Sequence, residues 1–262
     1  MMWIDAHCHL ADVRYKDQEL LQVISRSHAQ GVGMWIQGGV EPKDWERQLL
    51  IKANVDAGLV PCFGVHPEWV GRHSLGEVIG ALDRLKGVIH QGYGLGEVGL
   101  DFRKPYKEQR ELQIYALEEQ LQLAKKVNKP LVIHCVHAHA VLLDYLKKWG
   151  PFAAGGLVHS FSGSTEVAQE YIKLGLLISI SGEVIRDRSE KLKKAIITLP
   201  EDRIVIETDS PDQVIGVSLN EPACLIHVAQ AVGHLKGVSP ESLLSGSAQR
   251  LRSLFRLGLP HV

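Results

Sequence analysis

The sequence predicts an α/β fold, a (β/α)8 TIM barrel formed by a single domain over residues 1–262. Short apolar runs recur along the chain, and each is followed by a segment with helical periodicity, which is typical of parallel strands joined by crossover helices. A length of 262 residues suits one such barrel. Histidines and carboxylates follow most of the apolar runs, and a barrel gathers its functional residues at these strand ends.

The expected strands are the apolar runs themselves. Two of them, 130–134 and 203–207, are almost continuously apolar, which is typical of parallel strands buried on both faces. The full set covers residues 3–7, 32–37, 59–64, 91–97, 130–134, 155–159, 176–180 and 203–207.

Helical signals lie between these runs. Apolar residues recur at intervals of three and four over 114–124, which predicts an amphipathic helix. The segment Ser164–Val167 has the hydroxyl and early acid of a helix N-terminus, and Pro240 with Glu241 suits the first turn of a late helix.

Composition limits the function classes. A net charge of −1 argues against a broad basic surface for duplex DNA, although bound metal ions could supply positive charge locally. The four cysteines form no CxxC pair, and the N-terminus lacks a signal peptide, so we expect free thiols in the cytoplasm. No apolar run approaches the roughly 18 residues of a membrane span, and no obligate protein partner is evident.

Six of the eight expected strand ends carry His, Glu or Asp. Any one of these residues could be a core histidine or a helix cap. Together they would bury several imidazoles and carboxylates, which requires a compensating positive charge such as a divalent metal. The residues are His7 and His9, His66, Glu97 and Asp101, His134, His159, and Asp209.

The ligand set is too large for one tetrahedral site. A pair of divalent cations bridged by a carboxylate accommodates it better, and Glu97 is the expected bridge because its two oxygens can serve two ions. Imidazole and carboxylate together suit Zn, Mg, Mn or Co, so the identity of the metal stays open.

Strand order predicts how the other ligands divide. His7 and His9 point to the same side of an extended strand, and Asp209 follows the eighth strand, which neighbours the first. These three would hold one ion. His134 and His159, from the adjacent fifth and sixth strands, would hold the other.

Longer motifs surround these residues, in order from residue 5 to about residue 222. They are His7-Cys8-His9, Gly64-Val65-His66-Pro67, Gly96-Glu97-Val98-Gly99-Leu100-Asp101, Ile133-His134, His159-Ser160-Phe161-Ser162-Gly163, Glu207-Thr208-Asp209-Ser210-Pro211 and Asn220-Glu221-Pro222. Together they resemble the motifs of the TatD-type metal-dependent deoxyribonucleases of the amidohydrolase superfamily.

The resemblance implies a TIM barrel, two divalent cations, the same six metal ligands and a DNA substrate bound at the barrel mouth. It implies that His66 contacts the substrate, at its phosphate, and we place Asp101 among the substrate contacts too. Val136-His137 and Gln249-Arg250 depart from the usual family pattern. The first departure lies at the mouth and bears on the substrate, and neither touches the metal ligands.

We therefore expect a hydrolase that cleaves phosphodiester bonds with a metal-activated water. Asp209 and Glu97 are the expected catalytic residues, and Asp209 accepts the proton of the water. One alternative is a lactonase, amidase or deacylase, because the superfamily barrel hosts many chemistries. Another is a non-catalytic nucleic-acid-binding protein with structural metal, but structural sites are usually closed and four-coordinate, and no basic stripe with interleaved aromatic residues is visible.

Overall fold

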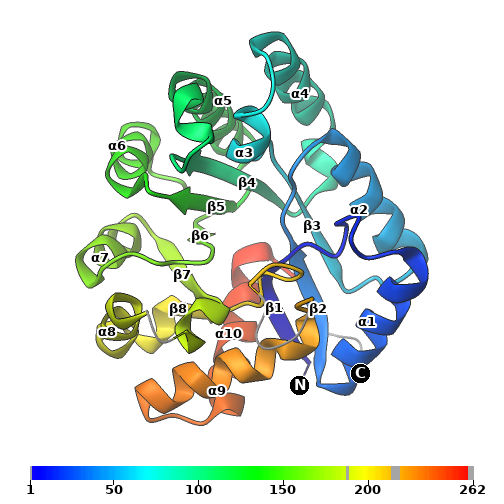
Figure 1. Ribbon diagram of the computed structural model, residues 1–262, viewed down its shortest axis with the longest axis vertical. Helices are drawn as coiled ribbons and strands as arrows, with labels where there is room; N and C mark the ends of the chain where they lie inside the picture. The colour runs from blue at the N-terminus through cyan, green and yellow to red at the C-terminus, as the bar shows by residue number, and fades with distance from the viewer. Residues whose placement is uncertain (1, 187–188, 214–218, 259–262) are drawn as a thin grey trace.

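The computed structural model describes residues 2–186, 189–213 and 219–258. Its eight strands are parallel and follow one another around a single sheet in the order β1 to β8, so the predicted TIM barrel is confirmed. A ring of helices surrounds the strands (Figure 1). The strands are β1 Trp3–Cys8, β2 Val32–Gln37, β3 Leu59–Phe63, β4 Gly94–Asp101, β5 Leu131–Val136, β6 Gly156–Val158, β7 Leu176–Ile180 and β8 Ile204–Ile206.

Two helices begin where the sequence signals lie, and the predicted helix over 114–124 lies within α5. The Ser164 hydroxyl accepts a hydrogen bond from the Val167 amide at the start of α7, and Pro240 is the first residue of α10. No helix in the described ranges is long and apolar enough to cross a membrane. The helices are α1 Asp17–Ala29, α2 Pro42–Asn54, α3 Pro67–Val70, α4 Leu75–Val88, α5 Arg110–Val127, α6 His139–Trp149, α7 Thr165–Lys173, α8 Glu190–Thr198, α9 Leu225–Lys236 and α10 Pro240–Phe255, with 3-10 turns η1 Ile89–Gln91, η2 Tyr106–Gln109, η3 Gly182–Ile185, η4 Glu201–Arg203 and η5 Pro222–Cys224.

Strand β4 differs from its expected bounds of 91–97. The turn η1 ends at Gln91, and the strand begins only at Gly94, where its pairing with β3 starts. The strand continues beyond Glu97 because its pairing with β5 extends to Asp101 and Val136. Glu97 and Asp101 therefore share one rigid strand.

Two backbone hydrogen bonds join the end of β1 to the segment after β8. The Asp209 amide donates to the His7 carbonyl at 3.0 Å, and the His9 amide donates to the Ser210 carbonyl at 2.7 Å. They bring the two ends of the sheet together, so the expected ligands of the first and eighth strands become neighbours.

The apolar core has two parts. Strand residues such as Ile4, Val132 and Val205 fill the barrel interior and pack against Leu251 and Phe255 of α10. A larger cluster lies between the strands and the surrounding helices. Because α10 covers the end of the barrel where the strands begin, the polar site forms at the opposite end, where they finish.

Candidate metal centre

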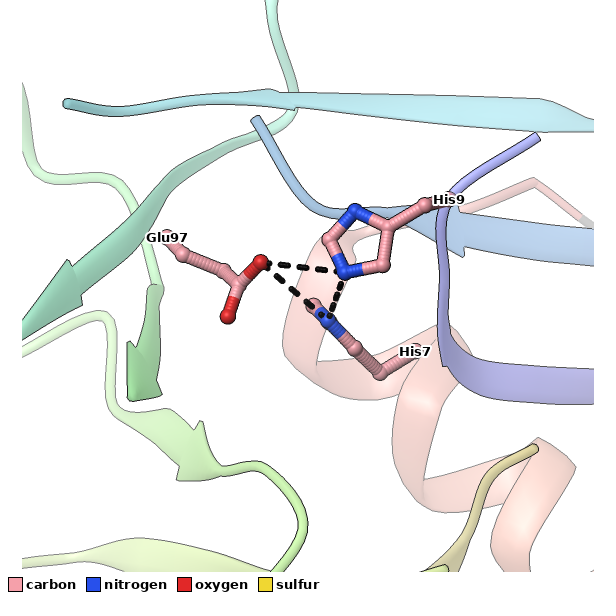
Figure 2. Close-up of side chains that lie close together, drawn as sticks. All are labelled: His7, His9 and Glu97. Atoms are coloured by element: carbon pink, nitrogen blue, oxygen red, sulfur yellow. Dashed lines mark hydrogen bonds and ion pairs between the residues drawn. The ribbon is translucent and has the colours of Figure 1, made fainter. Parts of the chain in front are cut away.

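Glu97 occupies the middle of the polar cluster. Its side chain is only 1% exposed, and its Oε1 lies 3.4 Å from Nε2 of His7 and 3.2 Å from Nε2 of His9. Figure 2 shows these three side chains turned toward one another. The two imidazole nitrogens are 3.2 Å apart, so the spacing His-x-His does place both rings on one side of the chain.

The second oxygen of Glu97 faces a different set of histidines. Oε2 lies 2.7 Å from Nε2 of His159, 3.4 Å from Nδ1 of His134 and 3.4 Å from Nε2 of His66. The two oxygens of this carboxylate therefore face two different groups of histidines. This is the arrangement that a carboxylate shared by two cations requires.

Asp209 approaches the cluster from beyond β8. Its Oδ1 lies 3.8 Å from Nε2 of both His7 and His9, while Oδ2 accepts a hydrogen bond from Nε2 of Gln213 at 2.7 Å. The backbone of Asp209 has φ 55°, in the left-handed region that residues other than glycine seldom adopt. This conformation turns the carboxylate toward β1.

The donor set fits divalent cations. Both oxygens of Glu97 are buried and have no hydrogen-bond partner among the described residues. Nδ1 of His134 and Nε2 of His159 lie 3.0 Å apart, and three groups of His, Glu and Asp side chains are close enough to share an ion. Buried ring nitrogens that face one another across an unpaired carboxylate are satisfied by a cation, because imidazole and carboxylate are common metal ligands.

The electrostatics of the cluster favour an ionised Glu97 and a neutral His7. Burial disfavours the charged form of His134 and His159, but the carboxylates that face these two rings more than offset this effect and raise the pKa of both. Burial raises the pKa of Glu97, but the facing histidines more than offset this effect and hold its pKa well below the usual range. Burial lowers the pKa of His7 to about 4, so this ring is neutral at pH 7 and has a free lone pair for a metal. Burial raises the pKa of Asp209 to about 7.

Asp101 lies behind His134 rather than in the open cleft. Its side chain is fully buried, and Oδ2 lies 3.1 Å from Nε2 of His134. It also accepts hydrogen bonds from Nε of Arg103, at 2.9 Å to each oxygen. A carboxylate that accepts the outer N–H of an imidazole fixes the inner nitrogen as a metal ligand.

His66 differs from His134 because its proton is on the ring nitrogen that faces the centre of the cluster. Its Nδ1 accepts a hydrogen bond from the Glu68 amide at 3.1 Å, so in the neutral ring the proton is on Nε2. That nitrogen points at the centre, 3.2 Å from Nδ1 of His134. Although His66 is close enough to share an ion with Glu97 and His134, its tautomer makes it a hydrogen-bond donor toward the centre.

Three supporting residues did not emerge from the sequence pattern as site residues. Asp5 accepts the amide of Thr208 at 2.9 Å and of His7 at 3.2 Å, and so ties β1 to the end of β8. Glu207 accepts the Ser160 amide at 2.5 Å. Gln213, the third, follows Asp209 by four residues and is recognisable only from its contact.

A glycine close to the centre is required for space. A Cβ at Gly38 would overlap the ring of His7 and would stand 2.9 Å from Oε1 of Glu97. The chain after β2 therefore passes the cluster with no side chain at this position.

The centre opens into a cleft of about 1040 Å³. Among its lining residues in the described ranges, carboxylates outnumber arginines and no lysine is present, so bound cations would balance the charge. Val136, which ends β5, and His137, which directly follows it, both line the cleft. The charged lining residues are Asp12, Glu41, Glu68, Glu97, Glu183, Asp209 and Asp212, with Arg14, Arg72, Arg103 and Arg186.

Comparison with known proteins places this site in context. The model of the family described as TatD related DNase matches residues 4–256. The chain is 30% identical over 259 residues to the "Uncharacterized metal-dependent hydrolase YabD" of Bacillus subtilis, covering 98% of this chain and 100% of that protein. It is 36% identical over 203 residues to the "3'-5' ssDNA/RNA exonuclease TatD" of Erwinia billingiae, covering 74% and 76%.

A solved structure resembles the whole barrel. The crystal structure of YjjV, a TatD homologue from Escherichia coli K12, superposes with a TM-score of 0.89 at 28% identity and covers 98% of each chain.

Proposed function

The chain belongs to the TatD related DNase family, and on this premise we propose that it cleaves phosphodiester bonds of DNA with two divalent cations bound at the barrel mouth. It is a metal-dependent, nuclease-like hydrolase that acts on ester bonds, in agreement with the sequence prediction. The observation that carries the finer proposal is the position of Glu97 between two histidine groups.

The other five predicted ligands divide around Glu97. His7, His9 and Asp209 would hold one cation, because Nε2 of each histidine faces both Glu97 Oε1 and Asp209 Oδ1. His134 and His159 would hold the other, because their ring nitrogens face Oε2. When bound, the cations supply a water of lowered pKa and offset negative charge on the phosphoryl oxygens.

The residues of the chain then have separate tasks. Asp209 faces the first cation with Oδ1 and accepts a hydrogen bond from Gln213 at Oδ2, and a remaining lone pair of its carboxylate would accept the proton of the water. The Nε2–H of His66 donates to a substrate oxygen. Asp101 acts through His134 instead of contacting the substrate, because its side chain has no exposed surface.

A panel of substrates tests this proposal. We expect metal-stripped protein to be inactive and Mg²⁺, Mn²⁺, Co²⁺ or Zn²⁺ to restore cleavage of a DNA oligonucleotide. Lactone, amide and carboxylic ester substrates, assayed with the same metals, serve as the comparison. Full activity without metal, or turnover of a lactone or amide far above that of DNA, would overturn the proposal.

A further inference from the structure

One wall of the cleft carries an aromatic stack that the metal centre does not use. Trp69 at the end of α3 and His73 beyond it both line the cleft. Their rings lie 3.8 Å apart at an interplanar angle of 16°. Nδ1 of His73 donates to the carbonyl oxygen of Trp69 at 2.7 Å, so the imidazole is held over the indole.

The stack has a fixed position relative to the metal centre. Helix α3 begins directly after His66, whose carbonyl accepts the Val70 amide at 3.0 Å. Trp69 is three residues beyond His66, about one helical turn. A substrate that meets Nε2 of His66 can therefore reach the stack with an adjacent group.

Two guanidinium groups lie beside the stack, those of Arg72 and Arg103. Arg72 follows α3, and its side chain is 63% exposed while it pairs with Glu68 at 3.3 Å. Arg103 lines the same cleft and also pairs with Glu68. The two guanidinium groups lie 5.2 Å and 5.9 Å from the centre of the Tyr106 ring. Glu68 thus holds both arginines on the wall that carries the aromatic rings.

Proteins commonly bind single-stranded nucleic acid with aromatic rings beside cations, because every base has a π-face and every linkage has a charge. Trp69 and His73 are half-buried residues that line the cleft. Building on the proposed function, we propose that the Trp69–His73 stack binds a nucleobase of a single-stranded substrate whose scissile phosphate lies at the metal centre. Arg72 and Arg103 contact the phosphates next to that base. The stack therefore makes the enzyme prefer substrates with bases to a bare sugar-phosphate chain.

The test compares two oligomers of equal length, oligo(dA) and an abasic oligomer with the same sugar-phosphate backbone. Trp69→Leu keeps an apolar side chain but removes the π-face, whereas Trp69→Phe keeps a π-face. We expect Trp69→Leu to lower kcat/KM on oligo(dA) by about 5- to 50-fold, mainly through KM, since base stacking on an aromatic side chain has this order of strength. Trp69→Leu should cleave the abasic oligomer at the wild-type rate. Trp69→Phe should retain most of the wild-type kcat/KM on oligo(dA). Trp149→Leu, at the end of α6 and outside the cleft lining, is the matched control and should change neither rate.

Two results would overturn the stacking site. Equal losses on both oligomers would mean that Trp69 acts only by packing α3 beneath His66, and no loss on oligo(dA) would mean that no base contacts the stack. A wild-type enzyme that cleaves neither oligomer with metal present would instead defeat the proposed function, and the stacking site with it.

Discussion

Asp209 and His66 differ in the atoms that they turn toward the metal centre. Asp209 presents a carboxylate oxygen, which can take a proton, whereas His66 presents an N–H, which can only donate. We therefore expect Asp209→Asn to lower kcat severely, since general-base assistance is typically worth about 10²–10⁴-fold. His66→Ala should mainly raise KM and retain metal.

Steady-state kinetics with metal content measured on both variants would separate the roles. Near-normal turnover in Asp209→Asn, together with loss of metal from His66→Ala, would mean that the two assignments are reversed.

The carboxylate of Asp101 orients His134 from behind. Its removal in Asp101→Ala leaves Nε2 of His134 without the acceptor that lies at 3.1 Å. We expect metal affinity to fall by about 10- to 100-fold, as is usual when such a supporting partner is lost. Asp101→Asn keeps an acceptor oxygen and should lose less. Metal titration followed by calorimetry checks both variants, and unchanged affinity in Asp101→Ala would contradict the positioning role.

At the level of single residues, the sequence predicts which residues form the metal centre better than it predicts the role of each one. His7, Glu97 and His159 are recognisable because each directly follows or ends an apolar run. Asp5 is not recognisable, because its contact with Thr208 joins segments that only the closed barrel brings together. Gln213 lies only four residues beyond Asp209, but no motif marks it, and its oxygen accepts the amide of the distant Glu183. The burial of Asp101 likewise depends on tertiary contacts that no local pattern shows.

Among the elements, the strands are the most predictable. A strand buried on both faces must be apolar along its length, so its position appears directly in the sequence. The bounds of β4 are less predictable because the start of the strand depends on pairing with β3 and its end on pairing with β5. The aromatic stack of Trp69 and His73 is not predictable from the sequence, which shows no long basic stripe. The two arginines beside the stack, Arg72 and Arg103, are 31 residues apart in the chain.

Helix α2 carries a titrating group that affects stability. Asp44, in its first turn, accepts the Val40 amide at 2.8 Å and Nε2 of Gln48 at 3.0 Å. Burial nevertheless raises its pKa to about 6, from 3.8. The folded protein therefore holds this proton more tightly than the unfolded chain, and the associated stability is present at low pH and is lost as the pH rises through about 6.

Asp44→Asn removes this titration. In metal-stripped protein, we expect the Tm of the variant minus that of the wild type to become more positive between about pH 4 and pH 6, as the ionisation of Asp44 weakens the wild type only. Thermal unfolding of both proteins across this range measures the difference. A difference that stays constant with pH would show that the pKa of Asp44 is not raised.

The apolar packing and the polar cluster lie at opposite ends of the barrel. Helix α10 packs against the interior at the end where the strands begin, and the polar cluster lies where they finish. Because many chemistries share this architecture, the fold does not choose the substrate, which depends on the side chains of the cleft. The net charge of −1 is a sum over the whole chain and does not show how charge is distributed. In the cleft carboxylates outnumber arginines, and the proposed cations would balance this excess of negative charge.

The bridging position of Glu97 is the central claim, and metal stoichiometry tests it most directly. Glu97→Gln preserves the shape of the side chain but removes the charge that both cations share. After equilibrium dialysis against Mn²⁺ or Zn²⁺, elemental analysis should find two cations per wild-type chain and a joint loss of both from the variant. A variant that retains one cation at full occupancy would contradict the bridge, because Glu97 would then serve a single ion.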